Sequence, residues 1–274
     1  MLHDAAPTGE YLMPKLLYLC LLFTTAYSAI QAEEKHQLRV LCYNIHYGQG
    51  TDGRYDLARL AKVIRETKPD LVALQEVDVG VARSSRVHEA RELGRLTDMA
   101  VRFGPTQHFQ GGLYGNAVLS RLPIEDVHIQ PLPYSDSDEN RTTYPRGAIA
   151  VQVRLANDQV IQFISTHFQH NVEEDRVAEA KAICEYFAGE GKLPSVLAGD
   201  MNASPRSEPI AILEKCWRHT QSAPFTPTAP STKPRTRIDY VFYQPETGLK
   251  LVESSVIDEP LASDHLPVLA VFDY

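Results

Sequence analysis

Short apolar segments in this sequence repeatedly end at polar residues of the types used in catalysis and metal binding. Segments with the composition of buried strands span residues 38–45, 71–74, 160–166, 196–198, 238–243 and 268–272. The polar residues at or beside them are Asn44, Gln75, Glu76, His167, Asp200, Asn202, Asp239, Asp264 and His265. Because α/β folds place their functional sites where strands run into loops, we expect these side chains to form the site.

Helical segments alternate with the predicted strands. The segments with helical spacing or composition are residues 57–67, 89–97 and 173–188. Residues 148–155 and 160–166 are instead typical of a β-hairpin. On the third helix, the charged residues Asp175, Arg176 and Glu179 are predicted to lie on a solvated face. The mixture predicts an α/β domain of packed sheets flanked by helices, with no internal repeat or linker.

The N-terminal part of the chain has the character of a secretory signal peptide. Lys15 precedes an uncharged run over residues 16–32, with an apolar centre and small residues near its end. We expect cleavage after Ser28 or Ala32, and Met13 is an alternative start. Residues 1–32 are therefore predicted to be a leader, and residues 33–274 one exported, periplasmic or extracellular domain. The alternative is a retained membrane anchor, although the run is shorter than the roughly 20 residues that a bilayer requires.

Charge and cysteine usage restrict the possible partners. The formal net charge is −8, which argues against a broad nucleic-acid-binding face. A small basic cluster is interrupted by glutamates and is interpreted as ordinary surface; its arginines are Arg83, Arg86, Arg91 and Arg95. The cysteines after the leader, Cys42, Cys184 and Cys216, are odd in number and widely spaced, so we expect buried thiols and no zinc site.

The residue types at the strand ends favour phosphate chemistry. Carboxylates and an amide oxygen are hard ligands that suit Mg²⁺ or Mn²⁺. A histidine beside a carboxylate can exchange protons near neutral pH, and Asn and His donors can stabilise charge on a phosphoryl group. Together they predict metal-assisted hydrolysis of a phosphoester, with a phosphodiester or a phosphomonoester as the substrate.

An ordered set of short motifs resembles the endonuclease/exonuclease/phosphatase superfamily. The motifs are Tyr43-Asn44-Ile45, Leu74-Gln75-Glu76-Val77, Gly115-Asn116-Ala117-Val118-Leu119-Ser120-Arg121, Ser165-Thr166-His167, Gly199-Asp200-Met201-Asn202, Arg237-Ile238-Asp239-Tyr240 and Ser263-Asp264-His265-Leu266-Pro267. The resemblance runs from about residue 38 to residue 272, and seven motifs in order are far more specific than one short pattern. It implies a four-layer α/β/β/α sandwich of two mainly antiparallel sheets flanked by helices.

The resemblance also implies roles for individual residues. Glu76 would be the main metal ligand, with Asn44 beside it and Asp264 contributing directly or through water. His265 would act at the scissile phosphate, as a general base or as a phosphate-stabilising cation, and Asp239 would orient it. The remaining catalytic roles fall to Asp200, which would position or deprotonate the attacking water, and to Asn202 and His167, which would contact phosphate oxygens.

Three further residues are candidates for substrate binding. Arg146 resembles a family arginine near the site and would contact a phosphate or brace a loop. His170 would approach the substrate or lie in solvent. Asn116 resembles a family position whose amide organises the site.

The resemblance covers several kinds of enzyme. Inositol polyphosphate 5-phosphatases carry a Cys-Asp-Arg word where this chain has Ile238-Asp239-Tyr240, so that branch is disfavoured. We expect a monomeric, Mg²⁺-dependent enzyme that acts on a small or lipid-borne phosphoester and has no membrane span after cleavage. The alternatives are an extracellular nuclease of the same superfamily, a catalytically silent phosphate-binding module on this fold, and a zinc hydrolase of another kind, which the absence of an H-E-x-x-H word disfavours.

Overall fold

The computed structural model describes residues 36–221 and 224–274, and these contain two six-stranded sheets. The strands of the first sheet are, in spatial order, β11 (Lys250–Val256), β12 (Val268–Asp273), β1 (Gln37–Asn44), β2 (Leu71–Val79), β4 (Gly112–Ser120) and β3 (Ala100–Phe109). Those of the second are β5 (Ile124–Pro131), β6 (Gly147–Arg154), β7 (Val160–His167), β8 (Ser195–Asp200), β10 (Asp239–Tyr243) and β9 (Arg218–His219). Each sheet is antiparallel except for one parallel pair, β1–β2 in the first and β7–β8 in the second.

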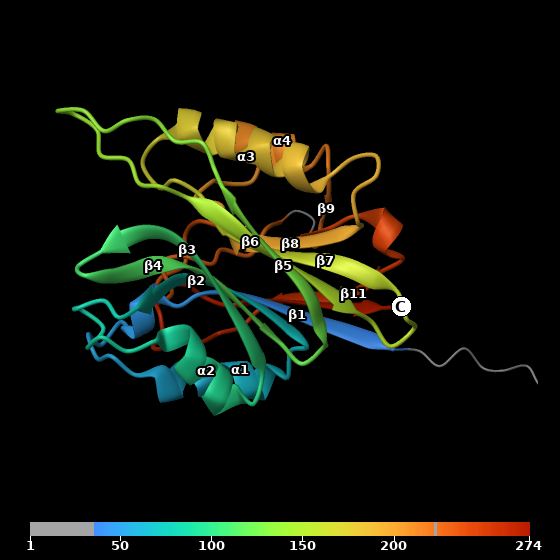
Figure 1. The fold of residues 1–274 in the computed structure, drawn as a ribbon, viewed down its shortest axis with the longest axis horizontal. Helices are drawn as coiled ribbons and strands as arrows, with labels where there is room; N and C mark the ends of the chain where they lie inside the picture. Colours follow the sequence, from blue (N-terminus) through green and yellow to red (C-terminus); the bar gives the residue numbers. More distant parts are fainter. Residues whose placement is uncertain (1–35, 222–223) are drawn as a thin grey trace, which may run out of the picture. The chain divides into compact units, whose positions relative to one another are not determined.

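The helices cover the outer faces of the two sheets. They are α1 (Leu57–Thr67), α2 (Glu89–Thr97), α3 (Glu173–Phe187) and α4 (Glu208–Leu213), with short 3₁₀ turns η1 (His46–Gly48) and η2 (Pro245–Thr247). Figure 1 shows α1 and α2 on one side and α3 and α4 on the other, with both sheets between them. The described residues thus form the predicted four-layer α/β/β/α sandwich.

Local sequence explains how these layers form. Helix α1 begins after Asp56, whose side chain accepts a hydrogen bond from Arg59 N at 3.0 Å, and ends at Lys68 in the left-handed conformation. Leu60 and Ile64 on its inner face are fully buried against β1 and β2. Burying each such side chain contributes about 1.5–3 kcal/mol relative to leaving it exposed.

The prediction of three buried thiols is wrong in one respect. Cys184 of α3 and Cys216, which follows α4, form a disulfide, whereas Cys42 is a buried free thiol. The two bonded cysteines are 32 residues apart in the sequence, and the packing of α3 against α4 brings them together. Sequence spacing alone does not reveal a pairing that depends on the packing of two helices.

The predicted leader lies outside the described residues, so its cleavage, the start at Met13 and the alternative of a retained anchor stay predictions. Within the part of the chain that is described, no helix is long and apolar enough to cross a membrane.

Candidate active site

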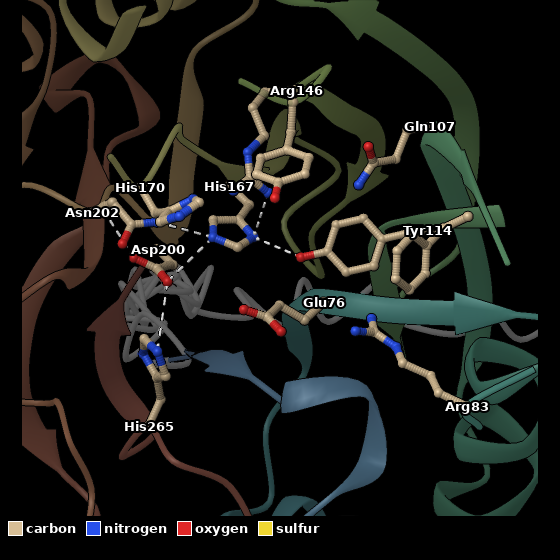
Figure 2. A pocket seen from close by; sticks show the side chains of 12 residues that line it. Glu76, Arg83, Gln107, Tyr114, Arg146, His167, His170, Asp200, Asn202 and His265 are labelled. Carbon is tan, nitrogen blue, oxygen red and sulfur yellow. Dashed lines mark hydrogen bonds and ion pairs between the residues drawn. The ribbon is translucent and has the colours of Figure 1, made fainter. Parts of the chain in front are cut away.

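A cavity of about 360 Å³ opens where the ends of strands from both sheets meet. Most of the predicted site residues line it, namely Glu76, Arg146, His167, His170, Asp200, Asn202 and His265 (Figure 2). They come from five separate stretches of sequence. The structure therefore brings together side chains that lie far apart along the chain.

Asn44, the last residue of β1, joins the two sheets at the floor of the site. Its Nδ2 donates to Glu76 Oε1 at 3.1 Å and to Asp200 Oδ2 at 3.0 Å, and its Oδ1 accepts from His46 N at 3.0 Å. Because Glu76 belongs to the first sheet and Asp200 to the second, one buried amide fixes the spacing of two carboxylates across the sandwich.

A β-bulge directs Glu76 into the cavity. The pairing of β2 with β4 shifts register between Leu74 and Val77, and Glu76 has a φ of +59°. The neighbouring Gln75 points into the core instead, where its Nε2 donates to Ser165 Oγ at 3.2 Å. Left-handed backbone at a non-glycine residue costs on the order of 1–3 kcal/mol and concentrates at functional sites.

His265 and Asp239 form a buried pair. Nδ1 of His265 lies 2.9 Å and 3.1 Å from the two carboxylate oxygens of Asp239, while Nε2 lies 3.8 Å from Asp200 Oδ2. Burial by itself lowers the pKa of His265, but the charges of Asp239 and Asp200 and the hydrogen bond to Asp239 together raise the pKa well above its usual value. The arrangement favours an imidazolium facing the cavity.

Asp200 lies between the two histidines of the site. Its Oδ1 accepts from Asn202 N at 2.9 Å, and its Oδ2 lies 3.4 Å from His167 Nε2. Burial raises the pKa of Asp200, with a further contribution from the charge of Asp239, while His265 opposes the shift. A carboxylate held in this way can accept a proton near neutral pH.

His167 is enclosed on all sides. Nε2 lies 3.0 Å from Asn202 Nδ2, while Nδ1 lies 3.2 Å from Arg146 Nη1 and 3.4 Å from the hydroxyl of Tyr114. Burial lowers the pKa of His167 well below its usual value, and the positive charge of Arg146 adds to that shift. His167 is therefore a neutral imidazole whose Nδ1 accepts from Arg146 Nη1.

Arg146 brings a buried cation to the cavity. Its side chain is almost fully buried, and its Nε has no hydrogen-bond partner among the described residues. Since leaving a buried charged group unpaired is costly, this geometry is suited to an anionic ligand.

Four predicted residues do not line the cavity, and a fifth lines it from an exposed position. Asn44, Asp239 and Asp264 do not line the cavity, although the first two bond to residues that do. Asn116 also lies behind the wall, where its Nδ2 donates to Gly147 O at 2.9 Å, next to Arg146. His170 lines the cavity from an exposed position, stacked on Tyr144 with ring centroids 5.7 Å apart.

The donor set fits a hard divalent cation. Asp264 Oδ1 is buried without a hydrogen-bond partner among the described residues, and Glu76 faces the cavity. Among the described residues, the possible ligand atoms that lie within 4.8 Å of one another are on Asp200, Asp239 and His265. Both oxygens of Asp239 already accept from His265, whereas on Glu76 only Oε1 accepts, from Asn44 Nδ2.

Five residues that line the cavity did not emerge as candidates from the sequence: Arg83, Gln107, Phe109, Tyr114 and Tyr144. The prediction that Arg83 belongs to the ordinary surface is wrong, because Arg83 lines the cavity. It forms a two-point ion pair with Asp78. Tyr114, which immediately precedes the Gly115–Arg121 motif, was the most accessible of the five to motif analysis. Tyr144 stands two residues before the predicted Arg146, whereas Gln107 and Phe109 occur in no motif.

Solved structures share this fold. A family protein from Beutenbergia cavernae is 26% identical with a TM-score of 0.72, and the match covers 86% of this chain and 71% of that one. A mannosyl-6-phosphatase from Bacteroides thetaiotaomicron is 17% identical with a TM-score of 0.66, over 85% of this chain and 98% of that one. ANGEL2, described as a 2',3'-cyclic phosphatase, is 17% identical with a TM-score of 0.66, and the match covers 87% of this chain and 95% of that one.

No curated protein matches the sequence. The model of the endonuclease/exonuclease/phosphatase family matches residues 41–265, which include every predicted site residue from Asn44 to His265. This match extends over most of the chain and agrees with both the fold and the residues around the cavity. The chain belongs to the endonuclease/exonuclease/phosphatase family.

Proposed function

We propose that this protein is an exported, Mg²⁺-dependent hydrolase of phosphoesters. The observation that carries the proposal is one cavity lined by a buried cation, by the histidine of a His–Asp pair and by a separate carboxylate. The Nε of that cation has no hydrogen-bond partner among the described residues. The cation is Arg146, the pair is His265 with Asp239, and the carboxylate is Asp200. A catalytically silent binding module has no need for all of them.

The metal site is assigned to Glu76, Asn44 and Asp264. When bound there, Mg²⁺ would neutralise charge on the phosphate and polarise its oxygens. Asp264 Oδ1 supports this assignment, because it is buried, accepts no hydrogen bond from the described residues and lies 3.8 Å from His46 Nδ1. Mn²⁺ suits the same hard donor set.

The protein's own residues hold the phosphoryl group. Arg146 supplies a positive charge. Asn202 and His167 would supply neutral hydrogen bonds to the phosphate oxygens, in exchange for contacts they now make with each other and with Phe168 O. His265 donates from Nε2, because Asp239 occupies Nδ1 and the carboxylates on either side favour the charged ring. We therefore assign His265 to charge stabilisation at the phosphate.

Asp200 positions the attacking water and accepts its proton. The water oxygen forms a bond to phosphorus while the ester P–O bond breaks. The leaving oxygen departs with the bonding electron pair and becomes an alcohol by taking up a proton from solvent, and Asp200 then returns its proton to solvent. Asn202 N and Asn44 Nδ2 hold the Asp200 carboxylate in place for this step.

Two features support the expected setting. The disulfide between Cys184 and Cys216 suits an oxidising compartment and therefore export. The negative net charge supports a small or lipid-borne phosphoester over a long nucleic acid. The protein is further proposed to act as a monomer.

The test is hydrolysis of p-nitrophenyl phosphate, bis-p-nitrophenyl phosphate, oligonucleotides and phospholipids, with Mg²⁺ or with EDTA. We expect turnover of at least one ester that EDTA abolishes and Mg²⁺ restores. His265→Ala should lower it by about 10³-fold or more, whereas His108→Ala, an exposed change on β3, should not. Absence of metal-dependent turnover across the whole panel would overturn the proposal.

A further inference from the structure

The cavity has a second wall that the proposed hydrolysis does not use. Figure 2 shows His265, Asp200 and Asn202 on one side and Arg83, Gln107 and Tyr114 on the other, with Glu76 between. Phe109 and Tyr144 also line the cavity. A phosphate held at the His265 side leaves this second wall to face the rest of the substrate.

Arg83 is fixed in place with one donor group to spare. Its Nε and Nη2 donate to the two oxygens of Asp78 at 2.8 and 3.0 Å. Its guanidinium also packs on two rings, with Cζ 3.7 Å from the ring centroid of Tyr47 and 4.7 Å from that of Phe109. Asp78 is fully buried, so its charge compensates that of Arg83. Nη1 donates to none of the described residues, which makes it a rigid hydrogen-bond donor with little net charge around it.

Gln107 adds polar groups, and two rings add flat surfaces. Residues two apart on a strand share a face, so Gln107 and Phe109 both point from β3 into the cavity while His108 between them is exposed. The Tyr144 ring is held by stacking on His170. The wall thus combines a planar donor, an amide and aromatic faces on fixed supports.

The wall's composition distinguishes among possible leaving groups. None of the described residues that line the cavity has an aliphatic side chain, so an acyl chain would find no matching surface. Binding of a second phosphate at this wall is disfavoured because the negative charge of Asp78 already neutralises the positive charge of Arg83. Ring hydroxyls, in contrast, need both donors and acceptors at defined positions, and a sugar ring offers an apolar face to an aromatic side chain.

We propose that the second wall binds a leaving group that contains a hydroxylated ring, so that the substrate is a sugar or cyclitol phosphoester. Arg83 Nη1 and Gln107 bind its hydroxyls, and Phe109 and Tyr144 pack on the ring. This inference rests on the proposed phosphoester hydrolysis and narrows its substrate from any small or lipid-borne ester to a polyhydroxylated one.

The experiment compares kcat/KM of the full protein with Mg²⁺ on defined esters. The hydroxylated probes are hexose 6-phosphates, inositol 1-phosphate and the diester glycerophosphoinositol. The references are p-nitrophenyl phosphate and bis-p-nitrophenyl phosphate, nucleoside 5'-monophosphates and vesicles containing phosphatidic acid. We expect at least one hydroxylated ester to exceed the nucleotides and lipids by tenfold or more, a factor in the range that specific hydroxyl contacts supply.

Gln107→Leu is the decisive variant because it keeps a side chain of similar volume that has no polar atoms. It should lower kcat/KM for the preferred hydroxylated ester by about tenfold, mainly through KM, and leave the nitrophenyl esters within about twofold. Arg83→Lys, which keeps a charge beside Asp78, should show the same selective loss. His108→Ala is the matched control and should change neither class.

The possible outcomes separate the two proposals. Hydrolysis of nitrophenyl esters without hydrolysis of any hydroxylated ester would overturn this inference and leave the proposed function intact. So would a preference for nucleotides or vesicles, or an equal loss on both ester classes in Gln107→Leu. Absence of all metal-dependent turnover would instead remove the proposed function.

Discussion

Asp239 has no exposure to solvent, and both of its carboxylate oxygens accept from the same nitrogen of His265. An amide at this position would keep the shape but would present an NH₂ group to one side of that nitrogen. Asp239→Asn should therefore lower kcat/KM by about 10³-fold or more, because the imidazole loses its orientation and its counter-charge. The measurement is steady-state hydrolysis, and thermal unfolding of the same variant shows whether it is folded. Wild-type activity in a folded variant would contradict the role of the pair.

Glu76 and His265 face the same cavity, but we assign only Glu76 to the metal. Glu76→Gln removes a carboxylate charge and should raise the Mn²⁺ dissociation constant by tenfold or more, whereas His265→Ala should change it little. Calorimetric titration of the apoprotein measures this without reference to turnover. Equal dissociation constants in the two variants would contradict the assignment.

At the scale of elements, two buried glutamates brace the helices against strand ends. Glu89 Oε2 of α2 accepts from Asp78 N at 2.8 Å, and Glu179 Oε2 of α3 accepts from Gln169 N at 2.9 Å. The prediction of a solvated face that includes Glu179 and Asp175 is therefore wrong, since both are buried. The solvated face was predicted from charge alone. An acidic side chain stays buried when its carboxyl group accepts a hydrogen bond from a buried backbone N–H group, as both glutamates do.

These glutamates give the fold a defined pH dependence. Burial raises the pKa of both Glu89 and Glu179 to about 8, from 4.5. The folded state then holds protons that the unfolded state has released, so the free energy of unfolding falls as pH rises from about 4.5 through 8. Urea denaturation at pH 5 and pH 8 measures the change. Glu89→Gln and Glu179→Gln should each flatten it, and an unchanged slope in the double variant would refute this origin.

The disulfide ties α3 to the chain that follows α4, away from the cavity. Closing a loop across a separation of 32 residues stabilises a fold by about 2–4 kcal/mol. The paired Cys184→Ser, Cys216→Ser variant should therefore unfold at lower temperature and retain wild-type kcat/KM at 25 °C. Cys42→Ser, at a thiol outside the disulfide, is the comparison for loss of a cysteine. An unchanged melting temperature in the paired variant would show that this link adds no stability.

Elements in the interior were more predictable than those at the edges. Helices α1 and α2 have the predicted bounds, and the predicted buried strands correspond to β1, β2, β7, β8, β10 and β12. Strands β3, β5 and β11 escaped prediction because they are edge or near-edge strands with largely exposed residues, which lack the continuous apolar pattern of a buried strand. These segments adopt β structure because they pair with the neighbouring strand of the sheet, and not because of their own hydrophobicity.

At the scale of the whole molecule, the cavity lies at the seam between the sheets. The side chains of Asn44 and Gln75 each bond across that seam, to Asp200 and Ser165. Motifs at strand ends located the reacting side of the cavity from sequence. The opposite wall, with Gln107 and Phe109 on edge strand β3, was not predictable because only the folded sheet brings it to the site.

Water attack at phosphorus is the central claim, and hydrolysis in H₂¹⁸O tests it most directly. Mass spectrometry of the products should find one ¹⁸O atom in the released phosphate and none in the alcohol, with Mg²⁺ present and not with EDTA. His265→Ala should lower the rate of label incorporation in proportion to turnover. Label in the alcohol, or equal turnover with EDTA, would contradict metal-dependent phosphoester hydrolysis at this cavity.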